Sequence, residues 1–137
     1  MPIETRWLVN GRVIYARLLG TITWDDITVN DMLIRAYLDN GISPVHIILD
    51  RREQTEPIPF SVRQIIDAMN GLRHPHHGQL VIVGQQFWLV HLFMRAANML
   101  TGIQVSRVET VADTLYYLAK NDPTLPDIQS ILDQLDE

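Results

Sequence analysis

The chain has no cysteine among its 137 residues, which excludes disulfide bonds, thiolate nucleophiles and zinc sites with cysteine ligands. It also lacks an excess of basic residues: 16 acidic side chains outnumber 11 lysines and arginines, and the formal net charge is −5. This balance argues against nucleic acid as a partner, because such binding requires a basic surface.

Long apolar runs are missing as well. The most apolar segment, residues 87–100, contains His91 and Arg95 and is too short to span a membrane. The chain does not open with a charged segment followed by an apolar run, so we expect no secretory signal and a cytoplasmic protein. With 47% hydrophobic and 20% charged residues, the composition is typical of one globular domain. We expect a single domain over residues 1–137, with a core at about 5–120 and a C-terminal amphipathic helix at about 124–136.

The hydrophobic pattern predicts an α/β domain with a mixed, mostly parallel sheet of about five strands. Two β-branched runs, at about residues 5–9 and 12–20, flank Asn10-Gly11, which favours a type I′ hairpin. Two short, nearly continuous apolar runs, at 45–49 and 80–84, are typical of buried strands, and residues 103–108 are expected to form another strand. Helical segments separate these runs, which indicates crossover connections and parallel pairing.

Capping patterns and helical spacing mark the helices. Thr23 and Asp26 form a capping box at the start of the first helix, and Gly41 is expected to end it in a left-handed conformation. Ser61 begins a second helix that is expected to reach Leu72, and Thr110 begins a fourth. The expected inward residues are Val29, Met32, Leu33, Ala36 and Tyr37; Val62, Ile65, Ile66 and Met69; Val111, Leu115 and Leu118; and, in the tail, Ile128, Ile131, Leu132 and Leu135.

The order of these landmarks resembles the SpoIIAA-like or STAS domains of anti-sigma-factor antagonists. The landmarks are the opening hairpin, "VHIILD" ending at Asp50, "LVIVG" before a helix with Trp88, and "VSRVETVADTLYYL". The last two are similar to the STAS/SEC14 branch of this family. The resemblance implies a non-catalytic regulatory or protein-interaction module with a protein partner. It also implies that a serine at the start of the second helix is a phosphorylation site, but the family's Asp-Ser-Ser-Gly-like motif is replaced here by "EPIPFSVRQ".

The junction between Asp50 and Ser61 has two interpretations. Ser61 with Gln64 completes a capping box, and Phe60 with Ile65 a hydrophobic staple, so we favour a structural cap. A phosphate on Ser61 at a helix start is the alternative, steadied by nearby arginines: Arg51, Arg52 and Arg63. Asp50, at the expected end of a strand, marks the edge where α/β sheets bind ligands, although we favour an anchor for backbone N–H groups of the next loop.

Pro57 and Pro59 fix φ and stiffen the approach to the second helix. The "RHPHHG" segment contains His74, His76 and His77, but no second ligand cluster completes a zinc site, so we expect no metal. No nucleophile, phosphate-binding or dinucleotide motif occurs, and we therefore expect no cofactor and no enzyme.

Helix 87–100 is apolar around most of its circumference, including Trp88 and Phe93. Such a helix requires a second cover besides the sheet, which the tail helix, another subunit or an apolar ligand would provide. A homodimer through this helix, the tail or both is the expected assembly. Full cover by protein would favour an interaction module, an apolar pocket beside the helix would favour a carrier of small molecules or lipids, and ionisable groups converging on Asp50 would favour an enzyme.

Overall fold

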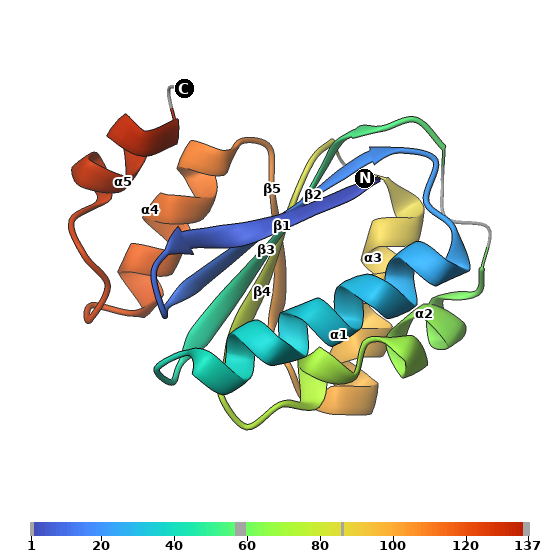
Figure 1. Cartoon of the computed structure of the whole chain (residues 1–137). Coiled ribbons are helices and arrows are strands. Elements are labelled where there is room, and N and C mark those ends of the chain that lie inside the picture. The colour runs from blue at the N-terminus through green and yellow to red at the C-terminus, as the bar shows by residue number, and fades with distance from the viewer. Residues whose placement is uncertain (1, 57–59, 86, 136–137) are drawn as a thin grey trace.

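A computed structural model describes residues 2–56, 60–85 and 87–135 and has a five-stranded sheet at its centre (Figure 1). The strands are β1 (Ile3–Val9), β2 (Val13–Gly20), β3 (Val45–Gln54), β4 (His77–Val83) and β5 (Val105–Val108). They lie side by side in the order β1-β2-β3-β4-β5. The β1–β2 pair is antiparallel and the other pairs are parallel. The predicted mixed, mostly parallel sheet is therefore confirmed.

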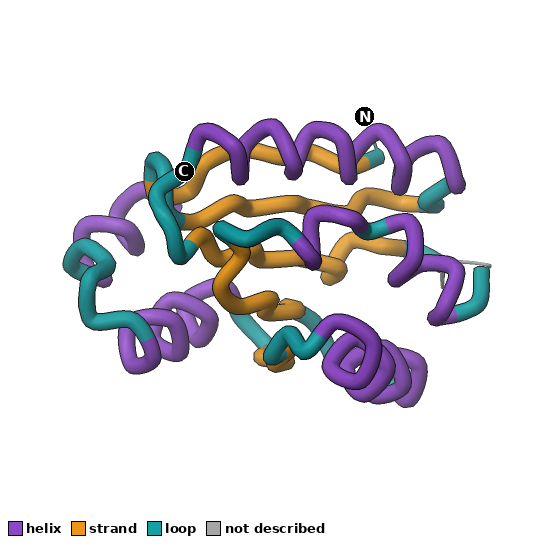
Figure 2. Tube along the Cα trace, turned by 90° about the horizontal axis from the view of Figure 1, so that it is seen from below, coloured by secondary structure: helices purple, strands orange, loops and turns teal. Residues whose placement is uncertain are grey.

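Helices cover both faces of this sheet (Figures 1 and 2). On one face lie α1 (Trp24–Asn40), α2 (Val62–Ala68), the 3-10 helix η1 (Asn70–Arg73) and α3 (Trp88–Thr101). On the other lie α4 (Val111–Asn121) and α5 (Ile128–Leu135). Alternate residues of the strands serve the two layers: Ile47 and Leu80 pack toward α1, whereas Ile48 and Val81 pack toward α4.

The opening hairpin forms where Asn10-Gly11 predicts it, but its turn differs from the expected type. Among the described residues only glycines have positive φ, so Asn10 does not adopt the conformation that a type I′ turn requires. Gly11 has φ +76°, and the Arg12 N–H donates to the Val9 carbonyl at 2.9 Å. Positive φ at the third turn position alone is typical of a type II turn.

The start of α1 is confirmed, whereas its predicted inner face is wrong. Thr23 and Asp26 form the capping box. The buried face is centred on Asp31, whose carboxylate accepts the Gly71 N–H at 2.8 Å and pairs with Arg35 at 3.1 Å. Because a charged residue stands in the middle of this face, the spacing of apolar residues did not identify it as the buried one. The residues buried with it are Ile27, Ile34 and Leu38, and the expected residues Val29, Met32, Leu33 and Ala36 are exposed.

Gly41 follows α1 for a different reason from the one expected. Its φ of −91° is not left-handed. A Cβ at this position would lie 2.6 Å from Cγ2 of Val45, closer than real side-chain contacts allow. Glycine therefore allows the chain to pass close to the start of β3.

Between β3 and α2 the structure corrects both expected boundaries. The strand continues to Gln54 instead of ending at Asp50, and α2 ends at Ala68 before η1 begins. The cap at Ser61 is confirmed: Ser61 Oγ accepts the Gln64 N–H at 3.1 Å, and Gln64 Oε1 accepts the Ser61 N–H at 3.0 Å. Pro57 and Pro59 lie outside the described residues.

The tail helix α5 packs against α4 and not over α3 (Figure 1). Ile131 is buried in the cluster around Leu115 and Leu118, with Leu132 beside it. The side chains of Ile128 and Leu135, also expected in this stripe, lie outside the described residues. Since the tail is used on the opposite face, it does not provide the second cover of α3.

Replacing Ser61 by alanine removes the acceptor for the Gln64 N–H. We expect Ser61→Ala to lower the free energy of unfolding by about 0.5–2 kcal/mol, and Ser61→Asp to preserve most of the stability because aspartate also caps helices. Urea denaturation of the three proteins measures this. An unchanged midpoint in Ser61→Ala would show that the cap contributes nothing.

Candidate functional site

The charged end of β3 distributes its side chains between the two layers. Successive residues of a strand point to opposite faces. Asp50 and Arg52 accordingly line a surface depression beside α4, whereas Arg51 lines an apolar cavity on the α1–α3 face. The candidate residues of this segment therefore belong to two separate places and do not form one site.

On the α4 side, Asp50 is the acceptor of a closed hydrogen-bond cluster. Its carboxylate is 3% exposed and accepts Arg52 Nε at 2.9 Å and Arg52 Nη2 at 2.7 Å. The Tyr15 hydroxyl donates to the same carboxylate. The Arg52 N–H also donates to Asp50 Oδ1 at 3.1 Å, which agrees with the expected role of Asp50 as an anchor for following backbone.

These groups converge on Asp50, the feature that would favour an enzyme, but their ionisation argues for a structural role. Burial raises the pKa of Asp50, yet hydrogen bonds from Arg52 and Tyr15 outweigh it, so its pKa lies below the usual value. Burial and then Asp50 raise the pKa of Tyr15 to about 12. Neither group changes its protonation near neutral pH, where a general acid or base would be poised.

The other charges around the depression, whose volume is about 800 Å³, are also matched. Arg17 pairs with Glu53, and the Arg6 guanidinium carbon lies 5.4 Å from the centre of the Tyr15 ring. The carboxylates that line this depression are therefore all paired with arginines, and Arg6 lies over an aromatic ring.

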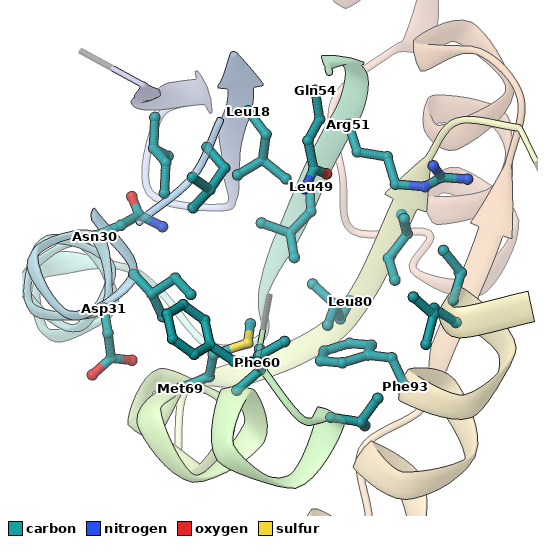
Figure 3. A pocket seen from close by; sticks show the side chains of 18 of the residues that line it. Leu18, Asn30, Asp31, Leu49, Arg51, Gln54, Phe60, Met69, Leu80 and Phe93 are labelled. Carbon is teal, nitrogen blue, oxygen red and sulfur yellow. The ribbon is translucent and has the colours of Figure 1, made fainter. Parts of the chain in front are cut away.

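The opposite face contains an apolar cavity of about 290 Å³ between the sheet and the helices α1, α2 and α3 (Figure 3). Leu49 and Leu80 form its floor on β3 and β4, and Phe93 of α3 points into it. Met69 and Phe60 close the side near α2. Phe93 and Arg51 are the two predicted candidates that the structure brings together here.

Arg51 borders this cavity with a guanidinium group that is only partly satisfied. Its Nε and Nη2 atoms are buried and have no hydrogen-bond partner among the described residues. Burial, followed by the charge of Arg107, lowers the pKa of Arg51. The side chain passes over Gly84, where a Cβ would lie 2.9 Å from Arg51 Cγ, and Gly84 has φ +151°. Only glycine therefore leaves the space that Arg51 occupies.

The two remaining candidates lie outside both places. Ser61 is exposed and engaged in the cap of α2. Trp88 is 64% exposed at the start of α3, on an outer surface with other large apolar side chains. These are Leu92, Met99 and Leu100.

The histidines of "RHPHHG" bond to different groups. His74 Nε2 donates to Asp39 at 2.7 Å, His76 Nδ1 to the Leu38 carbonyl at 2.8 Å, and His77 Nδ1 to the Leu72 carbonyl at 3.3 Å. The described residues contain no group of three or more side chains arranged to hold a metal ion. The absence of a metal stays a prediction. Within the same residues, no helix combines the length and apolar character needed to cross a membrane.

Sequence reasoning did not identify Tyr15, Gly84 or Arg107 as parts of these places. Tyr15 and Arg107 stand in strand patterns as ordinary alternating residues. Gly84, directly after "LVIV", carried the available signal, because a glycine at the carboxyl end of a buried strand marks close approach of another group.

Comparison with known proteins shows a SpoIIAA-like fold and thereby confirms the predicted one. An uncharacterized protein of the DUF3478 family from Shewanella loihica PV-4, described as having a SpoIIAA-like fold, superposes with a TM-score of 0.62 at 18% identity, covering 85% of this chain and 91% of that one. The anti-sigma factor antagonist SpoIIAA in its unphosphorylated form superposes with a TM-score of 0.57 at 8% identity, covering 88% of this chain and 99% of that one. No family model and no curated protein sequence matches.

Replacing Asp50 by asparagine tests the structural role of the cluster. We expect Asp50→Asn to destabilise the protein at pH 7 by about 1–3 kcal/mol, because it weakens charge-assisted hydrogen bonds to a buried acceptor. A carboxylate with a lowered pKa stabilises the fold above its unfolded pKa of about 3.9, and that contribution is lost as the pH falls through the folded value.

The difference in the free energy of unfolding between wild type and Asp50→Asn should therefore become smaller below about pH 4. Urea unfolding at several pH values measures it, with the exposed Asp67→Asn as the matched control. A difference that stays constant from pH 7 to pH 2, or one equal to that of the control, would contradict the assigned role.

Proposed function

We propose that this domain is a non-catalytic binding module that holds an apolar small molecule in the cavity between the sheet and α1, α2 and α3. The observation that carries the proposal is the cavity itself, beside a helix that the tail leaves uncovered. Its volume of about 290 Å³ lies just below the range of about 300–1,000 Å³ that is usual for ligand-binding pockets, so a small ligand is expected.

The chemistry of the cavity supports binding more than catalysis. Its floor and walls are mostly aliphatic and aromatic side chains of the sheet and of the helices on this face, including Ile34, Leu49 and Phe93. Asp31, the buried carboxylate at its edge, is already bonded to Gly71 and Arg35. The described lining contains no serine, cysteine, histidine, lysine or tyrosine, and its threonine and glutamate, Thr55 and Glu56, are exposed.

A second proposal concerns the outer surface of α3, which favours a protein partner. Trp88, Leu92 and Met99 are 64%, 47% and 82% exposed, and they recur at helical spacing along one side. We propose that a second copy of the chain covers this surface in a two-fold dimer, the commonest symmetric assembly. The tail helix, the other surface considered for the dimer, already packs on α4.

Nile red, a neutral apolar dye, tests the first proposal. We expect saturable binding with increased fluorescence, and at least about tenfold weaker binding in Leu89→Phe, because the added ring overfills the cavity. Leu92→Phe is the matched control: it makes the same change three residues along α3, on the outer surface. Absence of dye binding, or equal affinity in the two variants, would overturn the proposal.

Sedimentation equilibrium at micromolar concentration tests the dimer. The wild type should sediment as a dimer, and Leu92→Glu as a monomer, because a charge would be buried at the contact. Leu33→Glu, at an exposed position of α1, should remain dimeric. A monomeric wild type would exclude this assembly.

A further inference from the structure

We propose that the ligand of the cavity is amphipathic, with an anionic head group, a carboxylate or a phosphate, that binds Arg51 while its apolar body lies among Leu49, Leu80 and Phe93. This inference rests on the proposed function and adds the class of ligand. It is carried by the position of Arg51, by its missing partners and by the charges around it.

The Arg51 guanidinium lies at one end of the apolar group of side chains and not in the middle (Figure 3). That end is the carboxyl edge of the parallel strands. The β3–β4 pairing ends at Asp50 and Val83, Gly84 follows β4, and Arg107 lies in β5. Ligands of open α/β sheets bind outside this edge. An elongated molecule with a polar end would therefore place its head at Arg51 and its body in the cavity.

The Arg51 guanidinium lacks the carboxylate partner that three other arginines of the sheet region possess. Arg52 pairs with Asp50, Arg17 with Glu53 and Arg12 with Asp122. Arg51 makes no ion pair within the described chain, and its buried Nε and Nη2 have no acceptor. Buried charged donors without acceptors are costly and rare in folded proteins. Nε and one Nη of an arginine form the fork that a carboxylate or phosphate accepts in two parallel hydrogen bonds.

The surrounding charges reinforce the demand for an anion. Arg107 lies close enough to repel Arg51, and its Nη1 donates to the Gly84 carbonyl at 2.9 Å. Two carboxylates border the cavity, Asp31 and Glu56. Asp31 points away from the apolar group (Figure 3) and pairs with Arg35. Glu56 is exposed in the segment after β3. Neither carboxylate pairs with Arg51, so the positive charge at this end of the cavity would be neutralised by the anionic head group of a bound ligand.

Displacement of Nile red by three ligands with the same alkyl chain tests the inference. The three ligands are decanoate, decan-1-ol and decyltrimethylammonium. A fourth titration uses decyl phosphate, which has the same alkyl chain and a phosphate head group. We expect wild type to bind at least one anion about tenfold or more tightly than the alcohol, as charge-assisted hydrogen bonds imply, and the cation more weakly than the alcohol.

In Arg51→Gln the preference for the anion over the alcohol should disappear while the affinity for decan-1-ol stays within about twofold. Arg63→Gln removes the same charge from an exposed position of α2 and should keep the preference. Arg51→Lys, which retains the charge without the fork, should keep part of it. Urea unfolding of ligand-free Arg51→Gln should show a midpoint no lower than that of wild type, because the variant removes an unsatisfied buried charge.

The outcomes separate the two proposals. If the alcohol and the anions bind equally in wild type, or if Arg51→Gln keeps the preference, the head-group assignment is wrong while the cavity remains a binding site. If neither the dye nor any alkyl ligand binds, both proposals fall. A preference for decanoate or for decyl phosphate identifies which of the two head groups the site accepts.

Discussion

The alternation of β3 is the constraint on which the rest of the structure depends. The strand is central and its first half is buried and mostly apolar, but three charged residues, Asp50, Arg51 and Arg52, follow in its second half. Since neighbouring residues of a strand face opposite layers, these charges cannot neutralise one another in sequence order. Asp50 and Arg52 meet on the α4 side, where Tyr15 completes their hydrogen bonds. Arg51 is left alone on the other side, at the end of the apolar cavity.

The two faces of the sheet consequently differ in how completely their polar and apolar groups are satisfied. On the α4 face the charges are paired, and α5 completes the cover of the core through Ile131. On the α1–α3 face a cavity remains, an arginine lacks acceptors, and α3 exposes Trp88 and Met99. Unsatisfied donors and exposed apolar surface reduce the stability of the isolated chain, and they are typical of surfaces that bind something else. Both proposed binding surfaces, the cavity and the outer surface of α3, therefore lie on this one side of the sheet.

Much of the fold could be predicted from local patterns, because those patterns have local physical causes. Buried strands appear as apolar runs, and the caps at Thr23, Ser61 and Thr110 depend on residues three positions apart. The inner face of α1 could not be predicted, because Asp31 is satisfied by Gly71, forty residues away in sequence. Gly41 was misinterpreted for a similar reason, since its contact with Val45 exists only after folding.

The candidate site shows the same division. Asp50, Arg51 and Phe93 were identified as candidates from their places in the pattern. Their separation into a closed cluster and a cavity depends on how far β3 continues past Asp50, and the sequence places no turn residue there to mark the end. The lack of a partner for Arg51 also depends on contacts that form only when the chain folds. It follows from which acids the other arginines reach and from the space that Gly84 leaves.

Methyl NMR of the isotope-labelled protein during titration with decanoate measures most directly whether this cavity is a binding site. Saturable shifts should be largest for Ile34, Leu49 and Leu80, which line the cavity, and small for Val81, Leu115 and Leu118 on the opposite face. Shifts confined to the α4 face or to the outer surface of α3 at Leu92 and Leu100, with none in the cavity, would contradict it.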